Sequence, residues 1–233
     1  MSTVAVILAR GGSQGIPGKN LKDFCGKPLV AWTIEHARDA AHIDSVWVSS
    51  DDPEILSVGE SYGASAIERP VDIADSAASS ESGWLHALDA LAEKGVAVTR
   101  MVAPQCTSPV RTAGDFDGAL ELFEAEKLDS LFSATTIPDF NIWRPQADGT
   151  LDSYTYDYRR RERRQEKGEQ FLENGSFWIF IPEVLRSSGN RMDGKIGIWR
   201  QEFWKSFQID EPEDLRFCEV LMRAYLPEAT STP

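Results

Sequence analysis

The sequence is poor in cysteine and histidine, each of which occurs three times in 233 residues. The cysteines are odd in number, stand far apart and form no Cys-x-x-Cys pair: Cys25, Cys106 and Cys218. The histidines show no spacing that suits a set of metal ligands. These shortages argue against a disulfide framework and a zinc site, and they predict a protein of the reducing cytoplasm.

A long apolar run is also missing. The first residues, MSTVAVILAR, enter a strand-like segment at once, with no basic region and no extended apolar stretch before it. A membrane-spanning helix needs about 20 consecutive apolar residues, and a signal peptide needs a basic start followed by an apolar stretch. We therefore expect neither a signal peptide nor a membrane partner.

Positive charge is scarce, because 24 lysines and arginines face 37 aspartates and glutamates, for a net charge of −13. An acidic chain repels a phosphate backbone at long range, so we expect no nucleic-acid partner. A small anionic substrate is not excluded, since a local group of cations can outweigh the global field. The hydrophobic fraction of 42% and the length suit one globular domain covering residues 1–233.

Short β-rich runs alternate with segments of helical periodicity. The runs cover residues 3–9, 45–50, 99–103, 130–135, 176–181 and, in two pieces, 196–209. Apolar residues recur at helical spacing in 28–42, 79–95, 112–127 and 210–226, the third of which opens with a capping-box pattern at Thr112 and Asp115. This alternation predicts an α/β fold with a doubly wound, mainly parallel sheet.

Residues 138–170 interrupt that alternation. The segment is polar and aromatic, is longer than an ordinary loop and contains a hairpin signal at Asp148-Gly149. We interpret it as an excursion that packs on a partner subunit or covers a site. The alternative is a mobile surface loop.

A glycine-rich loop follows the first predicted strand, in the string VILARGGSQGIPGKN. Glycines allow the backbone to approach a ligand closely, and Arg10 and Lys19 bring positive charge to the two ends of the loop. Ligands of open α/β sheets bind at the carboxyl ends of the strands, where this loop is expected. The spacing fits neither a Walker A loop nor a dinucleotide fingerprint. The loop therefore indicates an anion site of another kind, or a purely structural turn.

Four segments, taken in order, resemble the CMP-sialic acid synthetases, also called N-acylneuraminate cytidylyltransferases. They are ARGGSQGIPGKNL, APQCTSPVR, RRQEKGEQFLENGSFWIF and SFQIDEPEDL, and together they span nearly the whole chain. The resemblance implies a nucleotide-diphosphosugar-transferase-like fold with a protruding dimerisation excursion, a homodimer and bound Mg²⁺. It also implies a reaction in which CTP and a 2-keto-3-deoxy sugar acid, such as sialic acid or a related nonulosonic acid, give the CMP-sugar and pyrophosphate.

The resemblance assigns the first loop to the nucleotide. Arg10 and Lys19 would act in catalysis by neutralising charge on the triphosphate. Backbone amides and side chains of the loop would bind the nucleotide: Gly11, Gly12, Ser13, Gln14 and Asn20. The cytidine half would contact Arg69 together with Ser79 or Ser80, although these serines equally suit a plain helix N-terminus.

Later segments would serve the sugar acid and the phosphates. The residues implied for substrate binding are Gln105, Thr107, Ser108, Arg111, Asn174 and Gly175. A plain surface cation is the alternative for Arg111. Arg163 and Arg164 lie in the densest basic run and would reach the phosphates or the sugar carboxylate, including across a dimer interface. The alternative for this run is a solvated charged face.

Asp210 is the magnesium ligand that the resemblance favours, with Gln208 at a second metal position. Many family members carry lysine where this chain has Gln14 and an acid where it has Gln208. Each change replaces a charged group with a neutral one, which weakens the corresponding contact. Asp210 or Glu211, just before Pro212, is also placed where a helix N-cap is expected, and the two roles are compatible.

Two alternatives to this activity stay open. One is activation of the eight-carbon sugar acid by an enzyme of the CMP-Kdo type. The other is a catalytically silent subunit that binds a sugar nucleotide, a reading suggested by Gln14 and Gln208.

Overall fold

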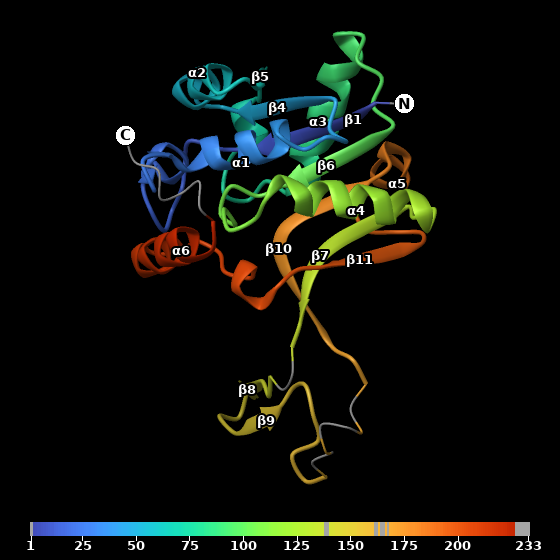
Figure 1. Cartoon of the computed structure of the whole chain (residues 1–233). Coiled ribbons are helices and arrows are strands. Elements are labelled where there is room, and N and C mark those ends of the chain that lie inside the picture. Colours follow the sequence, from blue (N-terminus) through green and yellow to red (C-terminus); the bar gives the residue numbers. More distant parts are fainter. Residues whose placement is uncertain (1, 138–139, 161–162, 164–165, 167, 227–233) are drawn as a thin grey trace.

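The computed structural model describes residues 2–137, 140–160, 163, 166 and 168–226 (Figure 1). A seven-stranded sheet forms its centre, in the order β11-β7-β10-β6-β1-β4-β5. Strand β10 runs antiparallel to both of its neighbours, and the other pairings are parallel. The predicted mainly parallel α/β sheet is therefore confirmed.

The strands of this sheet are β1 (Thr3–Leu8), β4 (Ser45–Ser50), β5 (Ser65–Glu68), β6 (Arg100–Pro104), β7 (Ser130–Thr136), β10 (Phe171–Phe180) and β11 (Ile196–Arg200). The sequence pattern missed β5, an edge strand of four residues. It also began β10 too late, because the polar residues ahead of Ser176 extend this strand beyond the body of the sheet.

The helices are α1 (Leu29–Arg38), α2 (Pro53–Ser61), α3 (Ser80–Glu93), α4 (Ala113–Ala125), α5 (Pro182–Ser188) and α6 (Pro212–Tyr225). The 3-10 turns are η1 (Lys19–Leu21), η2 (Val71–Ile73) and η3 (Phe203–Lys205), and a small hairpin joins β2 (Asp23–Phe24) to β3 (Lys27–Pro28). The capping box of Thr112 and Asp115 is present at the start of α4. The sequence pattern missed α2 and α5, which are short.

Both faces of the sheet are buried, as a parallel sheet requires. On one face, Ala5 and Ile7 of β1 pack in a cluster with residues of α1, α2 and α4. On the other, Val4 and Val6 pack with residues of α3 and α5. A third cluster joins the first loop, through Ile16, to α1 and α6. The carboxyl ends of β1 and β6 are thereby held beside the N-terminus of α6.

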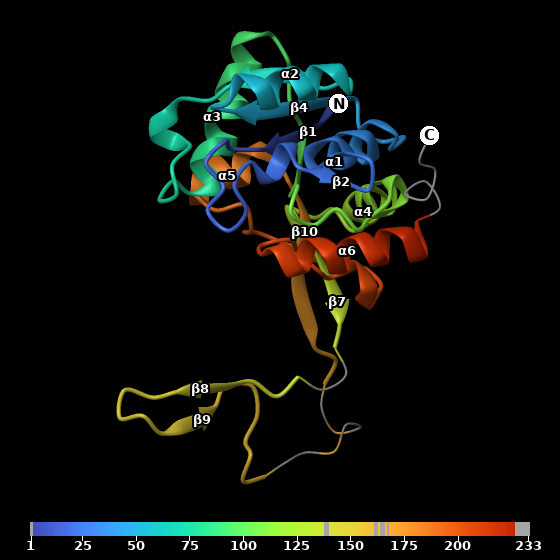
Figure 2. The same ribbon diagram turned by 90° about the vertical axis from the view of Figure 1, so that its left-hand side faces the viewer.

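The excursion projects from the body of the protein, beyond the ends of β7 and β10 (Figures 1 and 2). Its hairpin pairs β8 (Trp143–Pro145) with β9 (Leu151–Ser153). The turn includes Gly149, at a φ of 82°. The hairpin predicted at Asp148-Gly149 is therefore present. Large apolar side chains are exposed along the described part of the segment: Phe140, Ile142, Trp143, Leu151, Tyr154 and Tyr158.

No helix among the described residues is long and apolar enough to cross a membrane.

Candidate functional site

A cavity of about 530 Å³ lies at the carboxyl ends of β1 and β6. Three segments line it: the first loop, the residues after β6 and the segment that precedes α6. The predicted residues on its wall are Arg10, Ser13, Gln14, Lys19, Asn20, Gln105, Thr107, Gln208 and Asp210. Residues from positions 10 to 210 meet here because parallel strands present their carboxyl ends at one edge of the sheet.

The first loop is held in place by polar contacts on either side. The amide of Gly11 donates to Asp51 Oδ1 at 3.0 Å, and Asn20 Nδ2 donates to the carbonyl of Arg10 at 3.0 Å. The amide of Ser13 donates to the carbonyl of Gly11. The amides of Gly11 and Ser13 are thus bonded within the protein and help to hold the loop. The contact of these residues with the nucleotide stays a prediction.

Gly15 explains why the loop needs a glycine at its centre. A Cβ atom at this position would lie 2.2 Å from the carbonyl oxygen of Asp210, which is backbone and cannot turn away. The loop therefore closes directly on the segment before α6. By contrast, a Cβ atom at Gly12 would meet no atom within 4 Å.

Lys19 and Asp210 lie in contact. Lys19 Nζ donates to the carbonyl of Ile209 at 2.7 Å and to Asp210 Oδ1 at 3.2 Å. The lysine side chain is 11% exposed and the aspartate side chain 71% exposed. The predicted phosphate-binding cation and the predicted metal ligand thus belong to one site, in which Asp210 remains open to solvent.

A recess of about 290 Å³ adjoins the cavity and shares Leu8 and Arg10 with it. Ser79 and Ser80 line it together with Arg69, which is 6% exposed. Within the described part of the chain, Arg69 Nε has no hydrogen-bond partner. Burial lowers the pKa of this guanidinium, although the nearby Asp51 carboxylate opposes the shift. A buried cation with an unused donor beside a recess indicates a place for a polar ligand.

Arg10 and Ser79 mark the rim of this recess. Arg10 Nη1 donates to the carbonyl of Asp75 at 2.7 Å, so its charge is not neutralised by that contact. Ser79 caps α3, because its Oγ accepts from the amide of Ser82 at 3.1 Å. The helix-terminus role foreseen for the serines is therefore present for Ser79.

Arg111 does not reach the cavity. It is fully buried, and its guanidinium donates to Ser176 O at 2.8 Å, Thr33 Oγ1 at 2.6 Å and Gln105 O at 2.9 Å. Burial lowers its pKa to about 10. Neither the predicted substrate contact nor the surface alternative fits such a residue. Arg111 instead ties β10 and the end of β6 together beneath the site.

Asn174, Gly175 and Ser108 also lie behind the wall of the cavity. Asn174 Oδ1 accepts from Ser133 Oγ at 2.7 Å, and its Nδ2 donates to Gln201 Oε1 at 2.8 Å. Ser108 Oγ donates to the carbonyl of Gly175 at 3.4 Å. The side chains of Asn174 and Ser108 are thus bonded within the protein, and the substrate contacts of these three residues stay a prediction.

Comparison with known proteins identifies the family. A family model described as cytidylyltransferase matches residues 4–109. A pseudaminic acid cytidylyltransferase of Campylobacter jejuni subsp. jejuni serotype O:23/36 (strain 81-176) is 32% identical over 226 residues, which cover 96% of this chain and 97% of the relative. The chain belongs to the CMP-sialic acid synthetase family. The resemblance carried by the four sequence segments is thereby confirmed.

Other members of this family are longer than the chain. The N-acylneuraminate cytidylyltransferase of Oncorhynchus mykiss is 34% identical over 183 residues, which are 78% of this chain and 41% of that protein. The N-acylneuraminate cytidylyltransferase A of Danio rerio is 32% identical over 209 residues, which are 88% of this chain and 47% of that protein. The chain therefore spans less than half the length of these two fish relatives.

Solved structures show the fold of the family. A CMP:2-keto-3-deoxy-manno-octonic acid synthetase complexed with CTP superposes with a TM-score of 0.72 at 20% identity, covering 97% of this chain and 100% of that chain. A 4-diphosphocytidyl-2C-methyl-D-erythritol synthase reaches a TM-score of 0.68 at 10% identity, covering 95% of this chain and 99% of that chain. The predicted nucleotidyltransferase-like fold is confirmed.

Asp210 is the candidate metal ligand of the cavity. Its carboxylate is exposed, and its own amide and that of Glu211 donate to Asp214 Oδ2, which holds the segment in place. The residues that the structure describes include no group of three or more acidic, histidine or cysteine side chains able to hold a metal. Magnesium is commonly bound by one or two carboxylates together with substrate phosphates, and Asp210 fits that pattern.

The second predicted metal position is already engaged. Gln208 Nε2 donates to the carbonyl of Asn174 at 2.9 Å. Helix α6 begins after Glu211, which is its N-cap residue, so the helix cap expected at Asp210 or Glu211 is present at Glu211.

Of the two arginines predicted to reach the substrate from the basic run, only Arg163 is among the described residues, and it is not on the wall of the cavity. Arg163 is exposed on the excursion, where its amide donates to Glu166 Oε2 at 3.1 Å. Arg164 lies outside the described residues. The contact of Arg163 with the phosphates or the sugar carboxylate stays a prediction.

Two aspartates of the family site were missed by the sequence analysis. Asp51 holds the amide of Gly11, and the carbonyl of Asp75 holds Arg10. Asp51 follows β4, whose carboxyl end lies beside that of β1. The position of a polar residue directly after a parallel strand was the signal that could have found it.

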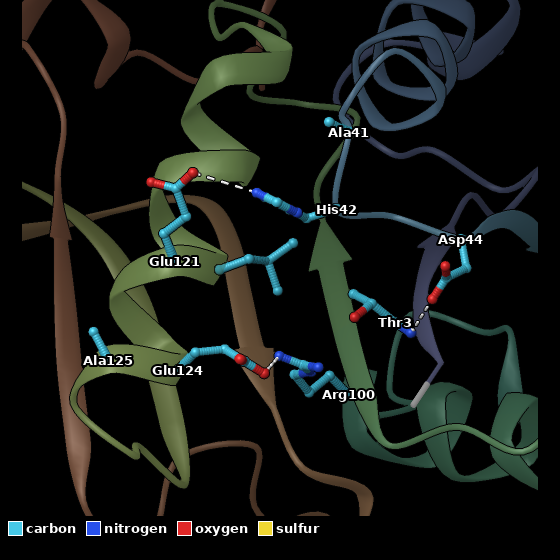
Figure 3. Close-up of a pocket in the computed structure, with 9 residues that line it drawn as sticks. Thr3, Ala41, His42, Asp44, Arg100, Glu121, Glu124 and Ala125 are labelled. Carbon is cyan, nitrogen blue, oxygen red and sulfur yellow. Dashed lines mark hydrogen bonds and ion pairs between the residues drawn. The ribbon is translucent and has the colours of Figure 1, made fainter.

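A larger hollow, of about 650 Å³, lies at the opposite end of the same sheet (Figure 3). His42 Nε2 lies 3.3 Å from Glu121 Oε1, and Arg100 pairs with Glu124. Asp44 Oδ2 accepts from the amide of Thr3 at 2.7 Å. Carboxylates outnumber cations here, and each charged group has a partner in the protein. This hollow therefore does not suit the triphosphate of a nucleotide, despite its size.

Proposed function

We propose that the chain transfers the cytidylyl group of CTP to a 2-keto-3-deoxy sugar acid of the sialic acid type, giving the CMP-sugar and pyrophosphate. One observation carries the proposal: in a member of this family, a glycine loop with Arg10 and Lys19 closes against Asp210 around one cavity. That cavity offers cations, open backbone and an exposed carboxylate, which are the groups that a triphosphate with its metal needs.

The nucleotide would span the cavity and the adjoining recess. The triphosphate would lie on the first loop, between Arg10, which bonds to a backbone carbonyl, and Lys19, which bonds to a carbonyl and to Asp210. The base would enter the recess, where Arg69 has an unused donor and Ser80 lies beside it. Cytosine presents two acceptor atoms, O2 and N3, and a buried guanidinium is suited to donate to them.

The reaction would form a bond between the anomeric oxygen of the sugar and the α-phosphorus of CTP. The bond from that phosphorus to the bridging oxygen would break, pyrophosphate would leave, and the hydroxyl proton would pass to solvent. Arg10 and Lys19 would stabilise the negative charge of the leaving group, and Gln105 and Thr107 would orient the sugar acid from the end of β6.

Asp210 would hold magnesium, which when bound would neutralise further charge on the phosphates. The contact between Lys19 and Asp210 supports this assignment, because it shows that the two groups reach the same point of the cavity. Lys19 would then turn from Asp210 toward the phosphates as the nucleotide enters.

We also propose a homodimer in the cytoplasm. The excursion exposes a row of apolar side chains that a second copy of the chain would cover: Phe140, Ile142, Trp143, Leu151 and Tyr154. Such an arrangement would bring Arg163 and Arg164 of one chain toward the sugar carboxylate or the phosphates bound to the other. The three cysteines are free thiols, which suits a reducing compartment.

The test is a substrate panel with the purified chain, CTP and Mg²⁺. The panel contains N-acetylneuraminic acid, its deaminated relative, pseudaminic acid and the eight-carbon 3-deoxy-octulosonic acid. We expect pyrophosphate release with at least one nine-carbon acid and a product with the mass of its CMP conjugate. Reaction with the eight-carbon acid alone would support the CMP-Kdo alternative. Binding of CTP without pyrophosphate release would support a silent subunit instead.

A further inference from the structure

The turn at Asn174–Gly175 lies behind the wall of the cavity, in contact with Gln208, which is part of that wall. Gln208 Nε2 donates to the carbonyl of Asn174 at 2.9 Å. Gly175 adopts a φ of 66°, and a Cβ atom there would lie 2.5 Å from Gln208 Nε2 and 3.1 Å from Gln105 Oε1. The turn is therefore packed between the two glutamines that line the cavity.

The carbonyl of Asn174 depends on a donor from outside its own strand. The register of β10 against β7 shifts between Glu173 and Trp178, so the ladder is interrupted where Asn174 lies. A buried carbonyl in an irregular strand must find a partner elsewhere. Gln208, which stands 34 residues later, provides it.

An amide and a carboxylate differ in this position. The amide nitrogen of Gln208 donates a hydrogen bond, whereas an ionised carboxylate only accepts and would face the carbonyl oxygen of Asn174 with like polarity. The bond thus explains why a neutral glutamine suits this chain at a position where the sequence resemblance expects an acid.

We infer that Gln208 is a positioning residue and not a metal ligand. It fixes the Asn174–Gly175 turn, and through the packing of that turn it holds Gln105 in place for the sugar acid, a reading that rests on the proposed function. Magnesium is then left to Asp210 and the phosphates, with no contribution from position 208.

Two variants separate this role from metal binding. Gln208→Met keeps the length of the side chain and removes the donor, and Gln208→Glu replaces the donor with a carboxylate that could bind a metal. For both we expect a melting temperature, measured without ligand, that is lower by about 2–6 °C, because a buried carbonyl loses its partner. The drop should be larger for Gln208→Glu.

The kinetic test compares the KM for the sugar acid with the KM for CTP. Both variants should raise the KM for the sugar acid about tenfold and leave the KM for CTP within about twofold, which corresponds to loss of one hydrogen bond. The Mg²⁺ affinity of the CTP complex, measured by calorimetry, should match that of the original chain in Gln208→Met.

The opposite pattern overturns the inference. A Gln208→Glu variant that is as stable as the original chain, binds Mg²⁺ more tightly and turns over faster would identify position 208 as a metal position. If the original chain shows no cytidylyl transfer at all, the proposed function fails. The order of the melting temperatures and the Mg²⁺ affinities still decide the role of Gln208 in that case.

Discussion

The two hollows at opposite ends of the central sheet both contain charged side chains, but they use them differently. At the carboxyl ends of the strands, Arg10 and Lys19 bond to backbone carbonyls and Lys19 also to an exposed aspartate. At the other end, His42 and Arg100 face the carboxylates of Glu121 and Glu124 (Figure 3). In the first hollow Arg10 therefore keeps its net charge and Lys19 shares its charge with a solvent-exposed carboxylate, whereas Arg100 in the second hollow is paired with Glu124.

The two ends of the sheet thus differ in the partners of their charges, and this difference, more than the volume of a hollow, favours the carboxyl end as the site of a nucleotide. A cation that bonds to a carbonyl remains a net charge, whereas one that pairs with a carboxylate is largely neutralised. The smaller hollow is also lined by the glycine-rich loop. Buried polar side chains that bond to one another lie behind its wall.

Replacing Lys19 should have the largest effect on catalysis. We expect Lys19→Ala to lower kcat/KM for pyrophosphate release by about 10²–10³, the usual cost of a lost charge-stabilising donor. Folding should change little, because one hydrogen bond is worth about 1 kcal/mol. Lys19→Arg, which keeps the charge, serves as the control and should retain more activity. Unchanged kinetics in Lys19→Ala would remove the loop from the mechanism.

Filling the loop should have the next largest effect. A methyl group at Gly15 would meet the carbonyl of Asp210 at 2.2 Å, so Gly15→Ala must push the two segments apart. Overpacking of this kind costs about 1–3 kcal/mol of stability. We expect a lower melting temperature together with at least about a tenfold loss of kcat/KM. Gly12→Ala, which has open space around it, should keep its melting temperature.

Low pH should destabilise the protein through His36, a buried residue of α1. Burial lowers the pKa of His36 to about 3, and the charges of Arg111 and Lys27 act in the same direction. Between pH 6.5 and pH 3 the unfolded chain therefore binds a proton that the folded chain does not, so stability falls as the pH falls. We expect a loss of about 2 kcal/mol between pH 7 and pH 5 from this residue.

Denaturant unfolding at several pH values measures this dependence. His36→Leu should show a shallower loss of stability in the same range, because it has no ring to protonate. Equal slopes for His36→Leu and the original chain would rule out His36 as the source.

Substitutions in the hollow that contains His42 and Glu121 should have the smallest effect. The side chains of His42 and Glu121 are 49% and 69% exposed, and even a charged pair at such an exposed position contributes only about 0–1 kcal/mol. We expect Glu121→Gln to change the free energy of unfolding by less than about 0.5 kcal/mol and to leave kcat/KM as it was. A large loss of activity in this variant would contradict the proposal that only the hollow at the carboxyl ends of the strands takes part in catalysis.

Much of the fold could be predicted because its signals are local. The alternation of β-rich and helical segments indicated the mainly parallel sheet, and Thr112 with Asp115 indicated the start of α4, which the structure contains. Strand β5 and helix α2 were missed, since short elements owe their stability to packing and carry weak patterns of their own.

The residues predicted for the candidate site fall into two groups, those that lie on the cavity and those that do not. Arg10, Lys19 and Asp210 were predicted from their segments and meet at the cavity, because each follows or precedes an element whose end faces this edge of the sheet. Arg111 and Asn174 were placed with the substrate, yet both are buried and bonded to the protein. Residue type alone did not distinguish a cation on the wall of the cavity, such as Arg10, from one buried away from it, such as Arg111.

The sequence by itself determined the fold class, the family and the segments that build the site, since these depend on patterns within a few tens of residues. Only the tertiary structure decided which polar groups stay free for a ligand. Asp51 takes the amide of Gly11, and Gln208 takes the carbonyl of Asn174, through contacts between residues far apart in the chain. Hydrogen-bond partners are set by such long-range packing, because every buried donor and acceptor must be satisfied by whatever the fold brings beside it.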